Sequence, residues 1–574
     1  MARQDLILIH APSVYDFRKE FLFYGPVSDL VPSTPVFEMY PFGFMTIAAH
    51  LHSLGYRVRI VNLASMMLND RNLDVPAFLK KLDAKTFGID LHWLPHAHGA
   101  LEVARLVKEL HPDSKVLMGG YSSTYFHKEL IRYPQVDLVM RGDSTEIPVA
   151  ELLAALDEGS PLEKVQNLTW KEGERVTENP MTFIPENLDY IDVDYGWIVR
   201  SVIRHRDLEG HKPFKDWDRY PLTVVFTVRG CYQQCLECGG SCSAMNHFLG
   251  RRKPAFRAPE KVAEDIYHIQ NFLKSPTFVV GDLRAGGKDY ATRFFSEAKK
   301  LGIDNQVVLE LFTPANKEFF QSAQGSLSSY SIEFSPESHS EEVRMALGRK
   351  YDTPSIEKSV VSALANGCQR FDLFFMVGLP KQDRKSALES ADYSRRLYSL
   401  VANDKRLFVF TSPLAPFLDP GSYAFENAEE SGYKVFARTL EEHRARLVSP
   451  SWKYVLSYET KWMTRDDIVE TSYDAADVLN KARFDCGLIG DDELKCRIDR
   501  TDMARQLMRE IDGVMVIADQ AKRDEGFSRL RERARDLMES TICQKRDLEW
   551  ETPGVIRSFP RAVFGLVRSK RKSK

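Results

Sequence analysis

The sequence has few cysteines, no long apolar run and almost no net charge, and each absence excludes a class of protein. Eight cysteines in 574 residues do not make a disulfide framework. No stretch approaches the roughly 18 consecutive apolar residues that a membrane-spanning helix requires. The 78 Lys and Arg residues nearly balance the 81 Asp and Glu residues, so no overall positive field draws the chain to nucleic acid.

The N-terminus also has none of the features of a targeting segment. The apolar run at residues 6–9 is too short for the core of a signal peptide, and Asp5 precedes it. We therefore expect a cytoplasmic protein. A hydrophobic content of 43% is enough to build large cores. At roughly 100–200 residues per domain, the length predicts about three or four domains.

Residues 1–160 alternate short apolar runs with helical patterns. Strands are expected at residues 6–10, 57–61, 86–89, 115–118 and 136–140, and helices at residues 44–54 and 100–110. This alternation predicts an α/β domain with a Rossmann-like parallel sheet, which binds ligands at the carboxyl ends of its strands. Residues 161–220 show a hairpin signal around Glu172-Gly173 but no other clear period, and we expect a connector there.

A second alternating series occupies residues 221–425. Strands are expected at residues 222–228, 277–280, 307–311, 330–334, 371–377 and 407–410, with helices such as 259–273 and 291–301 between them. Six strands with intervening helices predict a full or partial β/α barrel of the TIM type. Residues 426–574 are charged and predicted to be mainly helical. They end in a basic stretch, Arg557 to Lys574, which is either a solvated tail or a contact to an anionic surface.

Four of the eight cysteines fall close together directly after the first strand of this second series: Cys231, Cys235, Cys238 and Cys242. Offsets of zero, four and seven also fit one face of a helix that buries three thiols. Gly230 and the pair Gly239-Gly240 make a helix unfavourable there, so the pattern indicates a metal-binding loop.

The number of ligands decides which metal site this is. Thiolates favour zinc or an iron–sulfur cluster. Three cysteines would leave one iron of a cubane cluster open to a substrate or cofactor. If Cys242 is a fourth ligand, the site is closed, as in structural zinc sites. The sequence leaves both possibilities open.

The spacing Cys231-x-x-x-Cys235-x-x-Cys238 at the end of the first strand of a β/α series resembles the radical S-adenosylmethionine (SAM) superfamily. The resemblance implies a [4Fe-4S] cluster whose open iron binds the amino and carboxylate groups of SAM. It also implies reductive cleavage of SAM to methionine and a 5′-deoxyadenosyl radical. One residue departs from the family pattern, because Glu237 stands where an aromatic residue is usual.

The resemblance extends to the ends of later strands, where it implies contacts to SAM. A Gly-Asp pair resembles the family's Gly-Gly-Glu motif near the SAM amino group. A Ser-Pro-Glu segment lies where ribose and carboxylate contacts are usual, and a Gly-Leu-Pro turn is similar to the glycine motif next to adenine. Each also fits an ordinary strand-to-helix turn. The residues concerned are Gly281, Asp282, Ser335, Glu337, Gly378 and Pro380.

A Rossmann-like domain ahead of such a barrel is the domain order of the cobalamin-binding radical SAM class. The resemblance implies cobalamin contacts at the strand ends of the first domain, namely at Asp90, Gly119, Gly120, Tyr121, Arg141 and Glu146. No Asp-x-His-x-x-Gly motif occurs there, so a mutase-type histidine ligand to cobalt is not expected. We expect His92, His96 and His98 to be structural or surface residues.

These features predict an enzyme, most simply one that transfers a methyl group to an unactivated carbon of a small molecule. Its electron donor would be a flavodoxin or ferredoxin. Three alternatives stay open at this point. One is a radical SAM enzyme with non-methylating chemistry, another is a radical SAM enzyme whose first domain has lost cobalamin, and the third is a non-catalytic protein with a four-cysteine zinc site. No cysteine precedes Cys231 to hold a second cluster, which tells against the methylthiotransferases of the superfamily.

Overall fold

The N-terminal part of the chain is built on a mostly parallel sheet. The computed structural model describes residues 3–23, 25, 34, 36–537 and 540–550. The strand order is β2-β1-β3-β4-β5-β6-β7. The five parallel strands are β1 (Gln4–His10), β2 (Val58–Asn62), β3 (Ala84–Asp90), β4 (Lys115–Gly119) and β5 (Leu138–Met140). β1 is buried along its whole length because both faces of the sheet are covered, as its continuous apolar run predicts.

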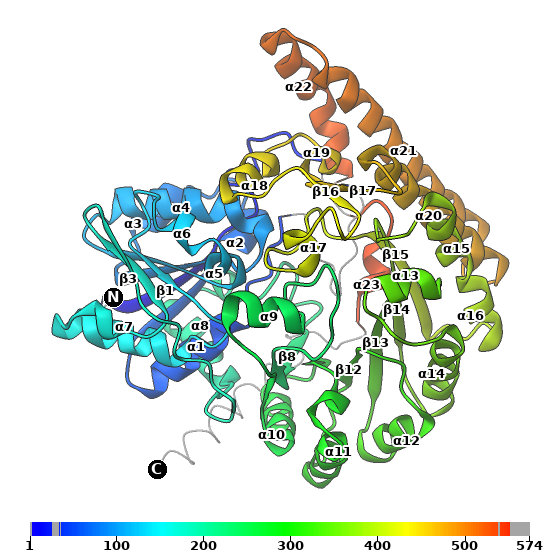
Figure 1. Cartoon of the computed structure of the whole chain (residues 1–574), viewed down its shortest axis with the longest axis horizontal. Helices are drawn as coiled ribbons and strands as arrows, with labels where there is room; N and C mark the ends of the chain where they lie inside the picture. The colour runs from blue at the N-terminus through cyan, green and yellow to red at the C-terminus, as the bar shows by residue number, and fades with distance from the viewer. Residues whose placement is uncertain (1–2, 24, 26–33, 35, 538–539, 551–574) are drawn as a thin grey trace.

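Helices cover both faces of this sheet (Figure 1). Alternate residues of β1 pack against the two helical layers. Its even-numbered apolar residues pack with α1 (Gly43–Ser53) and α7 (Glu146–Glu158). Its odd-numbered apolar residues pack with α3 (Val75–Lys80) and α4 (Ala97–Leu110). From β1 the chain passes to β2 on one side of it and then returns to form β3 on the other side. The direction in which strands are added therefore reverses between β1 and β3. Open α/β sheets bind ligands outside the carboxyl ends of the strands at such a point.

Two strands within the stretch expected to be a connector belong to this first sheet. β6 (Leu168–Glu172) pairs antiparallel with β5, and β7 (Arg175–Glu178) pairs antiparallel with β6. The expected hairpin is therefore present, and it extends the sheet at one edge. The same stretch also holds α8 (Tyr195–His205), which begins after Asp194 because that carboxylate accepts a hydrogen bond from the N–H of Trp197.

Six parallel strands form the second unit, in the order β15-β14-β13-β12-β11-β8. Their bounds are β8 (Thr223–Phe226), β11 (Thr277–Val280), β12 (Val307–Leu311), β13 (Tyr330–Glu337), β14 (Phe371–Val377) and β15 (Leu407–Pro413). The outer layer contains α10 (Pro259–Gln270), α11 (Tyr290–Leu301), α12 (Lys317–Ser326), α14 (Thr353–Ala365), α15 (Arg384–Asp392) and α16 (Ser394–Leu400). In the described ranges β8 and β15 do not pair with each other, so this is a partial barrel with one open side.

Side chains of the barrel strands alternate between the outer helices and the interior. Leu309 and Leu311 join the core beneath the helices, so Glu310 between them points inward. The interior is covered on its open side by the last described segment of the chain, which includes α23 (Lys545–Leu548). Within that segment, Trp550 packs with the inward-facing Phe278.

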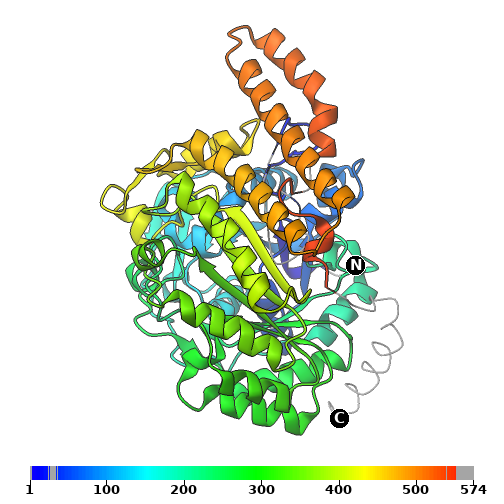
Figure 2. The same ribbon diagram turned by 90° about the vertical axis from the view of Figure 1, so that its right-hand side faces the viewer.

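The C-terminal region packs over one end of the barrel and then extends away from it. It contains β16 (Tyr433–Val435) and β17 (Tyr458–Thr460), which pair antiparallel. Three helices follow, α20 (Arg465–Asp485), α21 (Asp491–Met515) and α22 (Gln520–Asp536), and the last two form a hairpin that projects from the body (Figure 2). The predicted basic tail lies outside the described residues.

Shorter elements complete the described part of the chain: α2 (Leu63–Asn69), η1 (Leu94–His96), α5 (Tyr121–Tyr125), α6 (His127–Leu130), η2 (Leu162–Lys164), η3 (Glu209–His211), β9 (Val228–Arg229), α9 (Cys242–Leu249), β10 (Ala255–Phe256), η4 (Leu283–Gly286), α13 (Glu341–Ala346), α17 (Tyr423–Glu426), α18 (Leu440–Leu447) and α19 (Trp452–Val455). None of the described helices combines the length and the apolar composition needed to cross a bilayer.

Candidate functional site

The cysteine segment forms a loop at the carboxyl end of the first barrel strand. It follows the short strand β9 and ends where α9 begins at Cys242. Backbone N–H groups within the loop donate to two of the sulfur atoms, from Gln233 to Sγ of Cys231 at 3.3 Å and from Gly240 to Sγ of Cys238 at 3.3 Å. Such donors stabilise thiolates. The three motif cysteines are thus held on a non-helical loop, as a metal site requires.

The sulfur atoms are not arranged for a single zinc ion. Around one tetrahedral zinc, sulfur atoms at about 2.3 Å from the metal stand within about 4 Å of each other. Among the described residues, the cysteines do not form a group that could hold one metal ion. A cubane cluster is wider and holds its ligands further apart. Among the described residues, the four cysteines are therefore not gathered around one point as the ligands of a single bound ion would be.

Burial affects the protonation of all three thiols. It raises the pKa of Cys231, Cys235 and Cys238. The positive charge of Arg349 acts in the opposite direction on the pKa of Cys231 and Cys235. Each thiol is therefore protonated at neutral pH until a bound metal displaces its proton, which couples metal loading to proton release.

A turn that the sequence did not single out is packed directly on the cysteine loop. The N–H of Leu236 donates to the carbonyl of Leu347 at 3.1 Å. Next in the turn is Gly348, with φ +88°, where an added Cβ would lie 2.4 Å from the carbonyl oxygen of Gln234. Only glycine allows this close approach. The turn places the following residue, Arg349, beside the cysteines.

Arg349 and Glu337 form an ion pair in a cavity of about 150 Å³ beneath the loop. The two side chains lie 2.7 Å apart, and both line the cavity together with Cys235 and Cys238. Glu337 stands at a register shift in β13 and has φ +69°, a left-handed conformation that costs energy for a residue with a Cβ. The strain and the buried charges indicate a binding site for a zwitterionic or charged ligand. Sequence reasoning found Glu337 but missed Arg349.

Glu237, the residue that departs from the family pattern, is buried in the same cavity wall. Burial raises the pKa of Glu237 to about 8. Tyr433 of β16 donates its hydroxyl to Oε1 of Glu237 at 2.9 Å and approaches the carbonyl of Gly378 at 3.3 Å. The C-terminal region thus places an aromatic ring against the cysteine loop, and the Glu237 carboxyl group connects the loop to this ring.

At the end of β11, the residues expected to contact the SAM amino group have separate roles. Gly281 has φ +97°, and a Cβ there would lie 2.4 Å from Thr227. The Asp282 carboxylate is engaged by the side chain of Arg284 and by the N–H of Phe312 at 2.9 Å. Glu310 of β12 instead accepts the N–H of Gly281 at 2.7 Å, and burial raises its pKa to about 7. Glu310 faces the barrel interior, where its charge acts on Cys231 of the cysteine loop.

The remaining expected SAM residues lie at the ends of β13 and β14. Ser335 is half-buried in β13, two residues before Glu337. Gly378 follows β14 with φ +101°, and Pro380 is buried in the turn after it. Leu379 between them lines the cavity with the cysteines. The structure thus brings the Glu337 and Gly378 turns to the cysteine loop, whereas the Asp282 carboxylate is used to hold the β11 and β12 ends together.

A larger cavity, of about 350 Å³, lies between the two units. One wall consists of apolar residues on the α1 and α7 face of the first sheet, and the opposite wall comes from the first barrel strands. Five of the six residues expected to contact cobalamin line it: Asp90, Gly119, Gly120, Tyr121 and Glu146. Gly120 has φ +113°, and a Cβ there would lie 2.5 Å from the Cα of His92. The strand ends are therefore closely packed around this cavity.

Arg141, the sixth expected cobalamin residue, does not line this cavity. It is buried, bonds the carbonyl of Asn179 and pairs with Glu178 at 3.0 Å. Its guanidinium holds the edge hairpin β6–β7 against the end of β5. Because it follows β5 directly, the sequence could not distinguish this structural role from a ligand contact.

Three polar contacts join the two units around the site. Arg229, just before the cysteine loop, donates to Glu146 at 2.9 and 2.5 Å. Arg251 pairs with Asp143. Asp419 accepts the N–H of Gly239 at 2.9 Å and the indole N–H of Trp93 at 3.3 Å, so it connects the loop after β3 to the cysteine loop. Ligands in the two cavities would thus be held at a fixed separation.

Residues 30–151 match the family model of the B12 binding domain. Over 327 residues, 56% of this chain, the sequence is 24% identical to an uncharacterised methyltransferase of Pyrococcus horikoshii, 67% of which is covered. Over 161 residues it is 29% identical to the anaerobic magnesium-protoporphyrin IX monomethyl ester cyclase of Synechocystis sp., and the match covers 28% of each chain. The chain thus spans about a quarter to two thirds of the length of these curated relatives.

Among solved structures, the fold is similar to that of the radical SAM methyltransferase TsrM from Kitasatospora setae. The structure of TsrM with tryptophan and a SAM analogue has a TM-score of 0.54 at 13% identity, and the match covers 75% of this chain and 78% of TsrM. A second structure, with cobalamin and a [4Fe-4S] cluster bound, has a TM-score of 0.52. The two TsrM structures therefore show a fold shared over about three quarters of each chain.

Proposed function

We propose that this protein, which has the domain architecture and cysteine motif of the cobalamin-binding radical SAM class, is an enzyme of that class. The observation that carries the proposal is the position of the cysteine loop. It lies at the end of the first barrel strand, above a cavity that contains the Glu337–Arg349 pair, and it is tied to a B12-type domain by Arg229 and Asp419. The order of domains proposed is 1–160 for cobalamin, 161–220 as a connector whose strands β6 and β7 extend the first sheet, 221–425 as the barrel and 426–574 as a mainly helical C-terminal region.

When bound, the cluster and SAM supply a 5′-deoxyadenosyl radical that abstracts a hydrogen atom, and cobalamin supplies a methyl group. The chain's own residues bind and orient these groups. Cys231, Cys235 and Cys238 are the proposed cluster ligands. Arg349 has the charge to bind the SAM carboxylate. Glu310 beside Gly281 can accept hydrogen bonds from the SAM amino group, whose positive charge would favour the ionised carboxylate. Asp90, Gly119, Gly120 and Tyr121 are proposed to contact cobalamin at the strand ends.

The proposed reaction is methyl transfer to an unactivated carbon of a small molecule, with electrons from a flavodoxin or ferredoxin. Methyltransferases among the similar proteins support this reaction. The similarity to a cyclase favours a second candidate, radical chemistry without methyl transfer. SAM that carries a deuterated methyl group distinguishes the two. Methyl transfer gives a product three mass units heavier per CD₃ group than the product from unlabelled SAM. Non-methylating chemistry gives 5′-deoxyadenosine and an unlabelled product, and the CD₃ group leaves in methionine.

The first test is the metal content after anaerobic purification from cells supplied with cobalamin. We expect about four irons and about one cobalt per chain, and formation of 5′-deoxyadenosine on reduction with SAM. Cys235→Ala should lose the cluster, while Cys496→Ala, an exposed thiol on α21, should keep it. Iron without cobalt would remove cobalamin from the proposal. Zinc alone, with no iron after reconstitution, would overturn it.

The SAM contacts have a separate test. Replacing Arg349 by Gln in cluster-loaded protein should weaken SAM binding by about 10- to 100-fold, the value of one charge-assisted pair. Arg293→Gln is a matched control, because Arg293 pairs with Glu260 on the outer surface of the barrel helices. Equal SAM affinity in the two variants would exclude Arg349 from the SAM site.

A further inference from the structure

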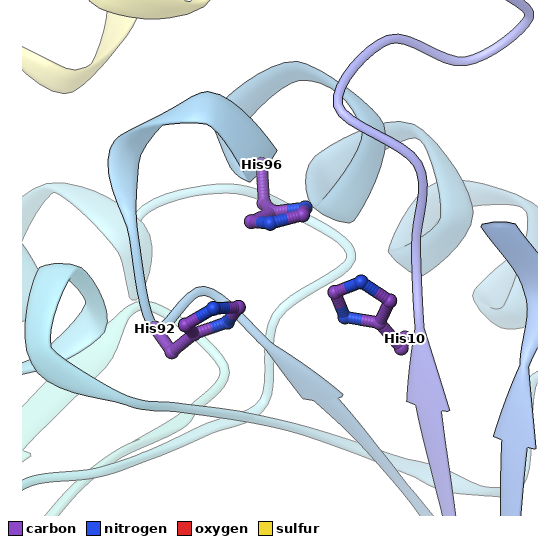
Figure 3. A group of neighbouring side chains, drawn as sticks. All are labelled: His10, His92 and His96. Carbon is purple, nitrogen blue, oxygen red and sulfur yellow. The ribbon is translucent and has the colours of Figure 1, made fainter. Parts of the chain in front are cut away.

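Three histidine side chains converge at the carboxyl edge of the first sheet (Figure 3). His10 is the last residue of β1, His92 lies in the loop after β3, and His96 ends η1. One nitrogen atom from each ring lies within 4.8 Å of the corresponding atoms of the other two. Among the described residues, this is the one group of His, Cys, Asp or Glu side chains arranged so that a single metal ion could be bound.

Two of the rings are oriented by acceptors at their Nδ1 atoms. His92 Nδ1 lies 2.6 Å from Oδ2 of Asp90, and His96 Nδ1 lies 3.2 Å from the carbonyl oxygen of Ala11. Each acceptor requires a proton on Nδ1, so the lone pair of each ring is at Nε2. Metal-binding histidines characteristically have this arrangement, with a carboxylate or carbonyl fixing the tautomer.

The third ring, His10, is held between two acceptors. Its Nδ1 lies 3.0 Å from Oδ1 of Asp90, and its Nε2 lies 3.0 Å from the carbonyl oxygen of Phe37. A metal ion bound at Nε2 would replace the proton that this atom donates to Phe37, and that proton would leave to solvent. Because the Phe37 carbonyl oxygen lies only 3.0 Å from Nε2, it would have to turn away to make room for the ion. Asp90 would then orient two of the three ligands, and its negative charge would offset part of the charge of the ion.

The three histidines and Asp90 are buried except on the side of His92. The side chains of His10 and Asp90 are 0% and 3% exposed, whereas that of His92 is 26% exposed. Asp90 and His92 line the 350 Å³ cavity between the two units. A metal bound here would have three protein ligands and a fourth position toward the cavity, which is the arrangement of zinc sites that bind a water or a substrate group.

We propose that His10, His92 and His96 bind a divalent transition-metal ion of the zinc class. Imidazole nitrogens suit zinc, nickel, copper and ferrous iron rather than magnesium or calcium. Around zinc the ligand nitrogens stand about 3.4 Å apart. The rings therefore need to move closer by a small rotation, for which His92 has the most room. This site is separate from the cysteine loop, but it shares Asp90 and the 350 Å³ cavity with the proposed cobalamin site.

Zinc binding to the full-length, cluster-loaded chain tests the proposal. The measurements are zinc per chain after dialysis, the zinc dissociation constant, and the zinc X-ray absorption spectrum, in which imidazole and thiolate ligands differ. We expect one zinc with an imidazole-rich shell. His92→Ala should weaken binding by at least 100-fold. Asp90→Asn should weaken it by about 10- to 100-fold, because it removes the orienting carboxylate. His268→Ala, which alters an exposed histidine on α10, should leave binding unchanged.

His92→Cys keeps the proposal testable if the alanine variant does not fold. It retains a zinc ligand, so zinc should stay bound and one sulfur neighbour should appear in the absorption spectrum. Zinc should also raise the melting temperature of the wild type and of His92→Cys but not of His92→Ala. Equal zinc binding by wild type and His92→Ala, or a wild-type spectrum with thiolate ligands alone, would overturn the proposal. Iron content and SAM cleavage are measured separately and test the proposed function.

Discussion

Arg229 and Glu146 form a two-hydrogen-bond ion pair between the residue just before the cysteine loop and the first residue of α7. The nitrogen-to-oxygen distances are 2.9 and 2.5 Å, and Glu146 also accepts the hydroxyl of Thr46 at 2.6 Å. Only 1% of the Glu146 side chain is exposed. Burial by itself raises the pKa of Glu146, but the charge and hydrogen bonds of Arg229 outweigh it and hold the pKa at about 2. The pair therefore fixes the first sheet to the barrel in ionised form.

Replacement of Glu146 by Gln should destabilise the protein, because the Arg229 guanidinium stays largely buried without a counter-ion. Removing one partner of a buried pair costs about 3–5 kcal/mol. Urea unfolding at pH 7 measures the change. Glu158→Gln, at the exposed end of the same helix, is the control and should change the free energy of unfolding by less than about 0.5 kcal/mol. Similar values for both variants would show that the ion pair does not hold the units together.

The same carboxylate should contribute to acid sensitivity. Its pKa is lower in the folded protein, at about 2, than the ordinary value of 4.5. Its stabilising contribution is therefore complete above about pH 4.5 and is lost as the pH falls from there toward 2. Melting temperatures measured from pH 6 to pH 3 should fall more steeply for wild type than for Glu146→Gln. Parallel curves would contradict the lowered pKa.

Gly348 should be essential for the cysteine loop. An alanine there would place Cβ 2.4 Å from the carbonyl oxygen of Gln234 and would also adopt a left-handed conformation. Gly487 is a matched control, because its φ is +70° and an added Cβ meets nothing within 4 Å. Both variants carry the backbone strain of about 1–2 kcal/mol. Only Gly348→Ala should also lower the iron content and SAM affinity, measured after reconstitution.

Replacement of Cys242 distinguishes a three-cysteine from a four-cysteine site. Cys242 is half-buried at the first position of α9, where its N–H donates to the carbonyl of Gln233 at 2.9 Å. Because this contact uses the backbone, Cys242→Ala should keep the loop and about four irons per chain. Cys238→Ala should lose most of the iron. Equal losses in both variants would support the closed site.

Much of the fold was predictable because parallel strands are continuous apolar runs separated by helical spacing. The barrel strands at residues 277–280, 307–311 and 371–377 have the predicted bounds. The sequence could not show that β6 and β7 join the first sheet. A hairpin signal predicts that two strands pair with each other but not which sheet they extend. Periodicity likewise could not show that β8 and β15 do not pair with each other in the described part of the chain.

The site was predictable where a local motif exists and not where residues meet only in the fold. The cysteine loop belongs to the first kind. Arg349 could not be predicted, because it meets the cysteine loop only in the fold. Its sequence signal is a Gly-Arg pair that lies over a hundred residues after the loop it contacts. Asp282 and Arg141 stand at strand ends, as ligand residues do, yet their charges are used by Arg284 and Glu178. His10 approaches His92 only because β1 and β3 are neighbours.

The stability of the C-terminal region should depend on the carboxylate of Asp547. Asp547 accepts hydrogen bonds from Arg497 at 2.7 Å and lies 3.5 Å from Arg483, and both guanidinium groups are largely buried. Burial raises the pKa of Asp547, but the hydrogen bond from Arg497 and the two positive charges outweigh it and keep the pKa low. Asp547→Asn should lower the free energy of unfolding by about 3 kcal/mol. Asp536→Asn, at an exposed position, should not.

The open side of the barrel has a consequence for biosynthesis. The last barrel strand ends at Pro413, but the segment that covers the interior includes Leu548 and Trp550. At about 5–20 residues per second, a ribosome needs roughly 7 to 27 seconds to make the chain between them. During that interval the nascent barrel exposes Phe278, Phe374 and Phe410 along its open side. Chaperone demand should therefore depend on translation speed through the part of the message that encodes residues 414–550.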